Sequence, residues 1–372
     1  MRAAGSTDSL KGRPSCIDAR IAQLVTDVLK VDPAHPDTEL IARAAECLRA
    51  GGLVAFPTET VYGLGAHALD RSAVLRLFAA KERPANDPLI VHVPTLDAAA
   101  SLVVEIPGMA RALAARFWPG PLTLVLKRSA RVPGEVTAGL ATVAIRVPSH
   151  PVARALLEQA RIPVAAPSAN LFSRPSPTRA AHVIADLDGR IDLIVDGGAT
   201  DVGLESTVVD LSEDVPTILR PGAIDLDALR HVEPGVVSRR AGASQPAAFA
   251  SPGMLPKHYS PRTPVVLYEG TRETALARLH SDAQQRVGRG ESVVVLSYTE
   301  DVSGLRHLGV RIVEVGAEDN PAAVAARLYD ALRECDELGA STILVRNITA
   351  SHPLSGAIQD RLRRSAALIQ DP

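Results

Sequence analysis

The chain has 372 residues, of which 46% are hydrophobic and 22% charged, and its formal net charge is −2. This length fits about two globular domains, and a charge near zero argues against a surface coated with nucleic-acid-binding cations, although a local basic groove is compatible with it. Three scattered cysteines without metal or disulfide spacing favour a reducing cytoplasm, and no apolar run approaches the roughly 20 residues that a membrane helix needs.

The first part of the chain is predicted to be a short tail followed by a capped helix. Residues 1–33 are interpreted as an amino-terminal tail with one helix, 17–30. The next helix is expected from Asp37 to Ala50, because Asp37 or Thr38 can cap its first turn and two glycines follow it.

Residues 53–93 contain the densest group of polar side chains beside apolar runs. A strand over 53–56 is followed by Pro-Thr-Glu-Thr and a glycine-flanked turn, then by a helix from Asp70. The basic segment Lys-Glu-Arg-Pro precedes a second strand, 88–93. In α/β folds, loops at the carboxyl ends of strands carry ligand-binding groups, so this stretch is predicted to form one wall of an anion site.

The rest of the chain predicts two α/β domains. The first, 34–232, mixes strands and helices without strict alternation, which favours a twisted mixed sheet with helices on its faces. Residues 233–262 are rich in Gly, Ser, Ala and Pro and are interpreted as a linker. From 263 to 372, helices at 273–287, 321–338 and 355–369 alternate with strands, which predicts a smaller parallel domain with Rossmann-like winding.

The sequence supports neither of two common nucleotide-binding motifs. Residues 63–68 fit G-x-G-x-x-A, but polar residues separate the glycines from the preceding strand and no helix starts from them, so a dinucleotide fingerprint is not predicted. The chain contains no G-x-x-x-x-G-K-[ST] segment. A nucleotide would therefore depend on side-chain cations, of which Lys81 and Arg83 are the obvious candidates.

Arg146 lies in an apolar predicted strand, 142–147, where an unpaired charge is costly. Its partner can be the carboxylate of a ligand or an internal Asp or Glu. Hydroxyls at strand ends, such as Ser168 and Ser206, are also used by turns and caps. The spacing of the histidines predicts no metal set. Composition and spacing thus predict an α/β protein with a cationic, hydroxyl-rich pocket suited to a phosphorylated ligand.

Eight motifs in one order carry a family resemblance: FPTETVYGLG, KERPANDPLIVHV, WPGPLT, TVAIRVP, PSAN, RPSPT, ESTVVD and LRPG. Over roughly residues 38–230 the chain resembles the YrdC-like threonylcarbamoyl-AMP synthases. SPGMLPKHYSP followed by an α/β domain is similar to the long form of that family. The resemblance implies a cytoplasmic nucleotidyltransferase that makes threonylcarbamoyl-AMP and pyrophosphate from L-threonine, bicarbonate and ATP, with Mg²⁺ accompanying ATP.

The resemblance also implies site residues and partners. The product would pass to a tRNA threonylcarbamoyl transferase complex, which modifies the adenosine beside the anticodon, with weak or no direct binding of tRNA by this chain. The linker would act as a lid. The implied catalytic residues are Lys81, Arg83 and Arg146; L-threonine would contact Thr60, His92, Arg146, Ala166 and Ser206; and ATP would contact Lys81, Arg83, Asp87, Thr142, Ser168, Ser176, Arg220, His258 and Tyr259.

Two positions depart from the family pattern. Asp87 stands where the family often has Asn, so its carboxylate is expected to contact a cation or Mg²⁺. The linker commonly reads GMKY, whereas residues 253–256 here read GMLP.

Three other classes of protein are alternatives for this sequence. An RNA-binding YrdC-like module without turnover is the main alternative, and the near-neutral charge and 3% aromatic residues count against it. A carbamoyltransferase of hydrogenase maturation would carry zinc-finger segments, but no paired C-x-x-C occurs. A Rossmann oxidoreductase is not predicted, because residues 63–68 do not form a dinucleotide fingerprint.

Overall fold

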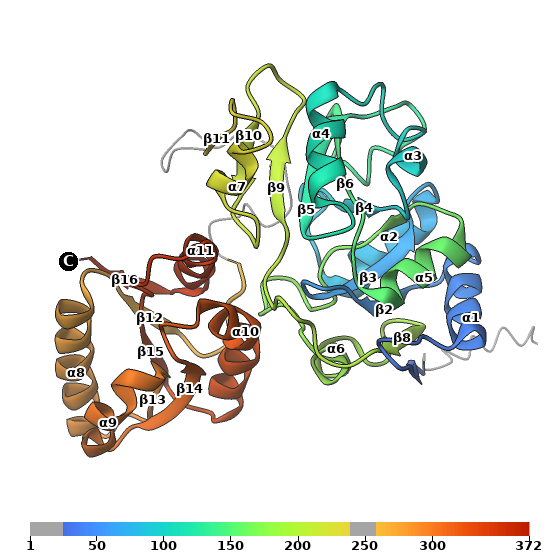
Figure 1. The fold of residues 1–372 in the computed structure, drawn as a ribbon. Coiled ribbons are helices and arrows are strands. Elements are labelled where there is room, and N and C mark those ends of the chain that lie inside the picture. Colours follow the sequence, from blue (N-terminus) through green and yellow to red (C-terminus); the bar gives the residue numbers. More distant parts are fainter. Residues whose placement is uncertain (1–24, 239–257, 372) are drawn as a thin grey trace, which may run out of the picture.

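The computed structural model describes residues 25–238 and 258–371. Within them, Figure 1 shows a larger domain on an 11-stranded mixed sheet and a smaller domain on a five-stranded parallel sheet. The predicted α/β class, with a mixed sheet and a second parallel sheet, is confirmed. The segment 253–256, where the linker departs from the family pattern, lies outside the described residues.

The larger sheet has the strand order β1-β8-β2-β3-β7-β4-β6-β5-β9-β10-β11. In chain order its strands are β1 (Asp27–Lys30), β2 (Val54–Pro57), β3 (Tyr62–His67), β4 (Ile90–His92), β5 (Leu122–Lys127), β6 (Thr142–Arg146), β7 (Val164–Ala165), β8 (Leu193–Asp196), β9 (Thr207–Asp210), β10 (Thr217–Arg220) and β11 (Val237–Ser238). The helices of this domain are α1 (Thr38–Arg49), α2 (Arg71–Lys81), α3 (Leu96–Ala99), α4 (Gly108–Phe117), α5 (Pro151–Ala160), α6 (Ala180–Leu187) and α7 (Leu226–Arg230).

Side chains alternate along each strand, so apolar residues point to both faces of this sheet, and helices cover both. Val54 and Phe56 of β2 pack with α1 and α5, whereas Ala55 packs into the core on the opposite face, with α2. Helix α1 begins as predicted, because the Asp37 side chain accepts hydrogen bonds from the backbone N–H groups of Glu39 and Leu40.

Two predicted segments differ at the edges of the larger domain. Residues 27–30, expected to end a helix in the tail, form β1, which pairs in parallel with β8. The helix prediction is therefore wrong for these residues, and the larger sheet begins inside the predicted tail. β11 likewise lies inside the predicted linker and pairs with β10. Sheet hydrogen bonds to distant segments decide both cases, and local periodicity does not contain that information.

The glycine-flanked segment after the polar cluster is a strand rather than a turn. β3 runs antiparallel to β2, with Gly65 opposite Val54 and Gly63 opposite Phe56. A side chain is excluded at Gly65, where a Cβ atom would lie 2.9 Å from both Phe56 Cε1 and Val164 Cγ1. The glycines thus allow close packing around a buried aromatic ring, which also explains why they form no dinucleotide fingerprint.

The smaller sheet has the order β14-β13-β15-β12-β16, with every pair parallel. The expected helix over 355–369 is wrong beyond Ser365, because Leu368–Gln370 leave it to pair with β12. The elements are β12 (Val265–Tyr268), α8 (Arg272–Gly288), β13 (Val293–Tyr298), the 3-10 turn η1 (Thr299–Asp301), α9 (Val302–Leu305), the 3-10 turn η2 (Arg306–Leu308), β14 (Arg311–Gly316), α10 (Pro321–Glu337), β15 (Thr342–Arg346), α11 (Ser355–Ser365) and β16 (Leu368–Gln370).

The smaller domain has two core layers. Val266 packs on the face of the sheet that α8 covers, while Val265 and Leu267 pack on the face covered by α10 and α11. In Figure 1, α10 and α11 lie on the side of this domain nearer the larger domain, and α8 lies on the far side. None of the helices in the described residues is long and apolar enough to cross a membrane.

We expect Gly65→Ala to destabilise the larger domain by about 1–3 kcal/mol, because the added methyl group overlaps Phe56 and Val164. Thermal unfolding measures this, and the midpoint should fall by several degrees. Gly108→Ala is the matched control: nothing lies within 4 Å of the added atom, so its midpoint should stay equal or rise slightly. Equal midpoints for the Gly65→Ala variant and the parent would contradict the close packing described.

Candidate active site

A cavity lies at the carboxyl ends of β4 and β6, where the parallel register places His92 beside Arg146. The β2–β3 connection and the segment after β7 form further walls. Most of the predicted site residues lie in these walls, so residues far apart in the sequence are brought together. The cavity is lined by Thr58, Thr60, Val61, Gly63, Arg83, Ile90, His92, Arg146, Ala166, Pro167, Ser168, Glu205, Arg220, His258 and Tyr259.

Arg146 has an internal carboxylate partner. Its Nη2 lies 2.6 Å from Glu59 Oε1, and its Nη1 donates to Thr60 Oγ1 at 2.9 Å. The second Glu59 oxygen accepts from the backbone N–H of Ser149, which fixes the carboxylate. The buried Nε of Arg146 has no hydrogen-bond partner among the described residues. Glu59 therefore orients the guanidinium group and leaves one donor for a ligand. Sequence reasoning left this internal pairing open without naming Glu59.

Arg83 and Asp87 form a buried pair beside the cavity. Arg83 Nη2 lies 2.9 Å from Asp87 Oδ2, but the atoms are out of line for a hydrogen bond, and both Asp87 oxygens lack hydrogen-bond partners among the described residues. Arg83 donates instead to the backbone oxygens of Asp87 and Pro88. Burial raises the pKa of Asp87, although the charge of Arg83 opposes this. The expected cation beside Asp87 is thus Arg83.

Lys81 lies behind the cavity wall rather than in it. Its Nζ donates to the backbone oxygens of Ser168 and Asn170, both at 2.5 Å. Burial, reinforced by the neighbouring charge of Arg83, lowers its pKa well below the usual value. Lys81 thereby holds the segment after β7, from which Ser168 reaches the cavity.

Three other predicted residues also lie outside the cavity lining. Ser206 shares a hydrogen bond with Thr123 at 2.7 Å and accepts from Arg220 at 3.2 Å, so it supports the wall from behind. Ser176 donates to Glu205 Oε1 at 2.5 Å. Thr142 is the first residue of β6 and Arg146 the last, so Thr142 lies at the other end of the strand from the cavity.

Glu205 is a charged wall residue that sequence reasoning missed. It immediately precedes Ser206, is buried, and accepts hydrogen bonds from Ser176, Tyr329 and Arg361. Burial alone would raise its pKa, but the charges of Arg361 and then Arg220 outweigh this, and the pKa falls to about 2. The feature of the sequence that could have identified Glu205 is its charge directly before a short, mostly apolar predicted strand.

Two buried histidines in the wall are held neutral. Burial, followed by the charge of Arg146, lowers the pKa of His92 to about 3. Burial, followed by the charge of Arg83, lowers that of His258 to about 3. Among the described residues, no group of three or more His, Cys, Asp or Glu side chains could hold a metal ion. These histidines can therefore offer neutral donors or acceptors to a ligand.

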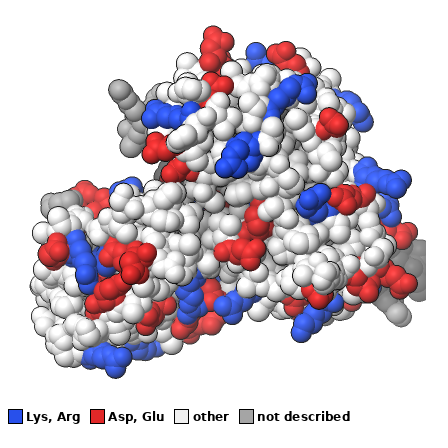
Figure 2. Space-filling model, in the orientation of Figure 1, with Lys and Arg blue, Asp and Glu red and all other residues white. Residues whose placement is uncertain are grey.

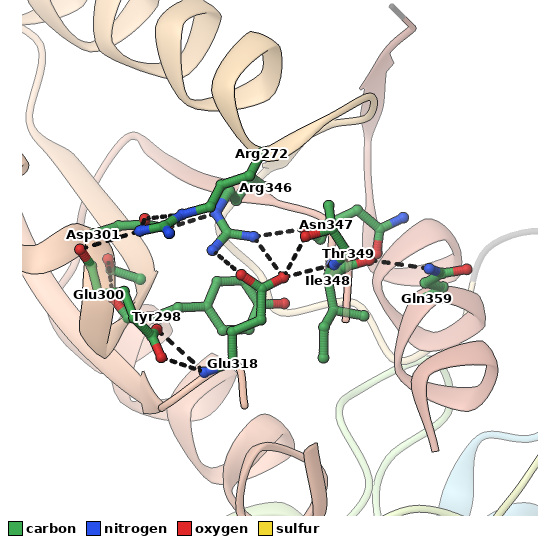
Figure 3. A network of polar contacts seen from close by, with 11 residues as sticks. Arg272, Tyr298, Glu300, Asp301, Glu318, Arg346, Asn347, Ile348, Thr349 and Gln359 are labelled. Atoms are coloured by element: carbon green, nitrogen blue, oxygen red, sulfur yellow. Dashed lines mark hydrogen bonds and ion pairs between the residues drawn. The ribbon is translucent and has the colours of Figure 1, made fainter. Parts of the chain in front are cut away.

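A second, wider crevice of about 840 Å³ lies at the carboxyl ends of the strands in the smaller domain. Figure 3 shows the polar network beneath it. Arg346 is fully buried, with its Nε 2.5 Å from Asp301 and its Nη2 2.6 Å from Glu318. Glu318 also accepts from the Thr349 hydroxyl, and Arg272 lies 2.8 Å from Asp301. These side chains bond to one another and so tie together the loops after β12, β13, β14 and β15.

Comparisons with protein families match the chain in two parts, and the second part begins before α7 and β11, the last elements of the larger domain. A family profile described as telomere recombination (Sua5, YciO and YrdC proteins) matches residues 46–222. A second profile, described as the carboxyl-terminal domain of threonylcarbamoyl-AMP synthase, matches residues 224–367.

Curated relatives match over nearly the whole chain. The threonylcarbamoyl-AMP synthase of Pyrococcus abyssi is 42% identical, covering 87% of this chain and 93% of its own length. The Bacillus subtilis synthase is 44% identical, over 92% of this chain and 96% of its own. The crystal structure of P. abyssi Sua5 with L-threonine superimposes with a TM-score of 0.85, at 40% identity, over 93% of this chain and all of that one. The chain is thus an enzyme of the long, two-domain class and belongs to the threonylcarbamoyl-AMP synthase family.

Thermal stability should fall as the pH decreases from 7 to 5, because His92 and His258 bind protons less readily in the folded state (pKa about 3) than in the unfolded state (about 6.5). Protonation then favours unfolding below about pH 6.5. His258→Gln should show a smaller fall of the unfolding midpoint over this range than the parent, measured by calorimetry. His35→Gln, at an exposed position, is the control and should follow the parent. A parallel pH response of all three proteins would contradict the neutral, buried state of His258.

Proposed function

We propose that this chain is an L-threonylcarbamoyladenylate synthase, a nucleotidyltransferase that forms threonylcarbamoyl-AMP and pyrophosphate from L-threonine, bicarbonate and ATP. The observation that carries the proposal is the cavity itself, where Arg146 has one unpartnered buried donor and Arg83 and Arg220 lie in the same enclosure. The P. abyssi structure with L-threonine, from a relative that covers nearly the whole chain, supports this ligand class. The cytoplasmic location predicted from the scattered cysteines is part of the proposal.

The reaction needs alignment and charge stabilisation rather than a protein nucleophile. The threonine nitrogen and the carbon of bicarbonate form a carbamate, with loss of water. A carbamate oxygen then attacks the α-phosphorus of ATP, and the bond from that phosphorus to pyrophosphate breaks. Two anions must approach each other, which cations fixed in a cavity facilitate.

At the threonine end, the Nε of Arg146 would donate to the amino-acid carboxylate. Glu59 and Thr60 already hold the other two nitrogens of this guanidinium, so its orientation would not change on binding. Neutral His92 and the backbone at Ala166 lie in the same wall. A charge-assisted hydrogen bond to a fixed donor is worth roughly 1.5–3 kcal/mol.

At the ATP end, Arg83, Arg220, Ser168, His258 and Tyr259 would surround the nucleotide. Lys81, Asp87 and Ser176 act one layer further out in this proposal. Mg²⁺ would enter as part of the MgATP substrate, since it commonly keeps several waters and binds through substrate phosphates.

The product would pass to a tRNA threonylcarbamoyl transferase complex, without strong binding of tRNA by this chain. On the face shown in Figure 2, basic and acidic side chains are interspersed over both domains, and the described residues of this face form no continuous basic surface. Binding of an RNA backbone depends on such a surface. On this face, the described residues offer no continuous basic surface for an RNA backbone, which supports turnover over the RNA-binding alternative.

The deciding measurement is pyrophosphate release from ATP, with threonine and bicarbonate omitted in turn. Release should require both. Arg146→Gln should lower kcat/KM for threonine roughly 10- to 100-fold, because it removes the charge-assisted bond. Arg154→Gln is the control, since Arg154 is exposed on α5, and its activity should equal that of the parent.

If folded protein releases no pyrophosphate in the presence of all three substrates, the proposed reaction is wrong. A salt-dependent affinity for RNA in the same preparation would then favour the binding-module alternative.

A further inference from the structure

One face of α10, in the smaller domain, contacts the segments of the larger domain that support the cavity wall. Asp330, Arg333 and Asp336 lie three residues apart, so their side chains project from the same side of the helix. Arg333 donates to the backbone oxygen of Pro175 at 2.5 Å and to Asp186 at 2.7 Å. The segment before Ser176 is therefore held directly by the second domain.

Contacts on either side of Arg333 extend this attachment. Asp330 accepts from Arg179 at 2.9 Å and lies 3.1 Å from His182. Asp336 lies 3.4 Å from Arg174. The segment from Arg174 to Thr178, which carries Ser176, thus lies between ionic contacts to one helix.

The backbone of the larger domain also approaches α10 closely. A Cβ atom at Gly203 would lie 2.4 Å from the Cα atom of Ala326, and Gly203 has a φ of +74°. Glycine accepts that left-handed conformation and leaves room for the helix. The contact between the domains therefore extends to backbone packing beside Glu205.

Glu205 is where this attachment reaches the cavity. Its Oε1 accepts from Ser176 at 2.5 Å and from Tyr329 at 3.1 Å. Its Oε2 accepts from Tyr329 at 2.9 Å and from Arg361 Nε at 2.7 Å. The single hydroxyl hydrogen of Tyr329 is shared between the two oxygens, so three donor groups hold this carboxylate. Two residues of the smaller domain thus fix the orientation of a cavity-wall carboxylate.

Arg361 touches three separate pieces of the proposed ATP-binding wall. Besides Glu205, its Nη2 donates to the backbone oxygen of Pro221, next to Arg220, at 3.0 Å. Its guanidinium lies over the ring of Tyr259, 5.1 Å from the ring centre. Tyr259 has a φ of 61°, an uncommon conformation for a residue with a side chain, and its ring packs against the ring of Tyr329 with ring centres 5.5 Å apart.

We propose that Arg361 and Tyr329 are positioning residues for ATP, acting through Glu205 and Tyr259. This inference rests on the proposed function, in that it assigns the nucleotide to this wall. Neither side chain contacts Thr60, His92 or Arg146, which form the proposed threonine end. The second domain therefore shapes the ATP end of the cavity selectively.

The test separates the two substrates and uses the full chain. Tyr329→Phe removes one hydroxyl and keeps the ring against Tyr259. It should raise KM for ATP about fivefold, the loss expected for one hydrogen bond. Arg361→Lys keeps the charge but cannot reproduce the forked contacts, and should raise KM for ATP at least tenfold. KM for threonine should change less than twofold in both variants.

Tyr298→Phe is the matched control. Tyr298 is a buried tyrosine of the same domain that packs under Arg346, away from Glu205. Loss of its hydroxyl group should leave KM for ATP unchanged. The dissociation constant of ATP, measured by calorimetry without threonine or bicarbonate, gives a readout that does not depend on turnover.

The outcomes distinguish the inference from the proposed function. A parent that binds ATP but makes no threonylcarbamoyl-AMP contradicts the function, while weaker ATP binding by the variants would still support the positioning role. Unchanged ATP affinity in both folded variants overturns the inference. Equal increases of KM for ATP and threonine would also overturn it, because a general loss of structure would act on both ends of the cavity.

Discussion

The buried carboxylate of Glu205 joins the two domains at the wall of the cavity. A carboxylate removed from water is destabilising unless it is paired and hydrogen-bonded, and here most of its partners come from the other domain. The larger domain alone would leave this charge with Ser176 and the nearby Arg220. The association of the domains and the electrostatics of the cavity therefore depend on the same contacts.

The same principle governs the rest of the cavity. Arg146 is oriented by Glu59, and Arg83 lies against Asp87. Both guanidinium groups are held by contacts within the protein, Arg146 by Glu59 and Thr60 and Arg83 by backbone oxygens, so little reorganisation is needed when an anionic ligand binds. In the smaller domain, Arg346 has an equivalent arrangement with Asp301 and Glu318, and there it secures the loops at the carboxyl ends of the strands.

The sequence predicted those features that depend on local signals. Helix α1 starts at its Asp37 cap, α2 follows Asp70, and α10 begins at the predicted residue, Pro321. The errors occur where pairing with distant segments decides. β1 was predicted as the end of a helix and β16 as part of one, yet each adds a strand to a sheet edge. β3 was missed because its glycines resemble a turn, and their packing role depends on Phe56 and Val164.

The site shows the same division. Motif order indicated most residues that line the cavity, but spacing could not show that Glu59 pairs with Arg146, or that Lys81 faces two carbonyl oxygens instead of the cavity. The contribution of Tyr329 and Arg361 was beyond sequence reasoning, because they lie more than 100 residues after Glu205 and belong to no motif of the site. Only the folded arrangement places them beside it.

The position of Lys81 has a consequence for how the cavity responds to its surroundings. Its side-chain nitrogen lies between the backbone oxygens of Ser168 and Asn170 and links them through two hydrogen bonds. Because this donor is part of the chain and buried, ions in solution cannot replace it and screen its hydrogen bonds little. The loop that carries Ser168 should therefore keep its shape across a wide range of ionic compositions.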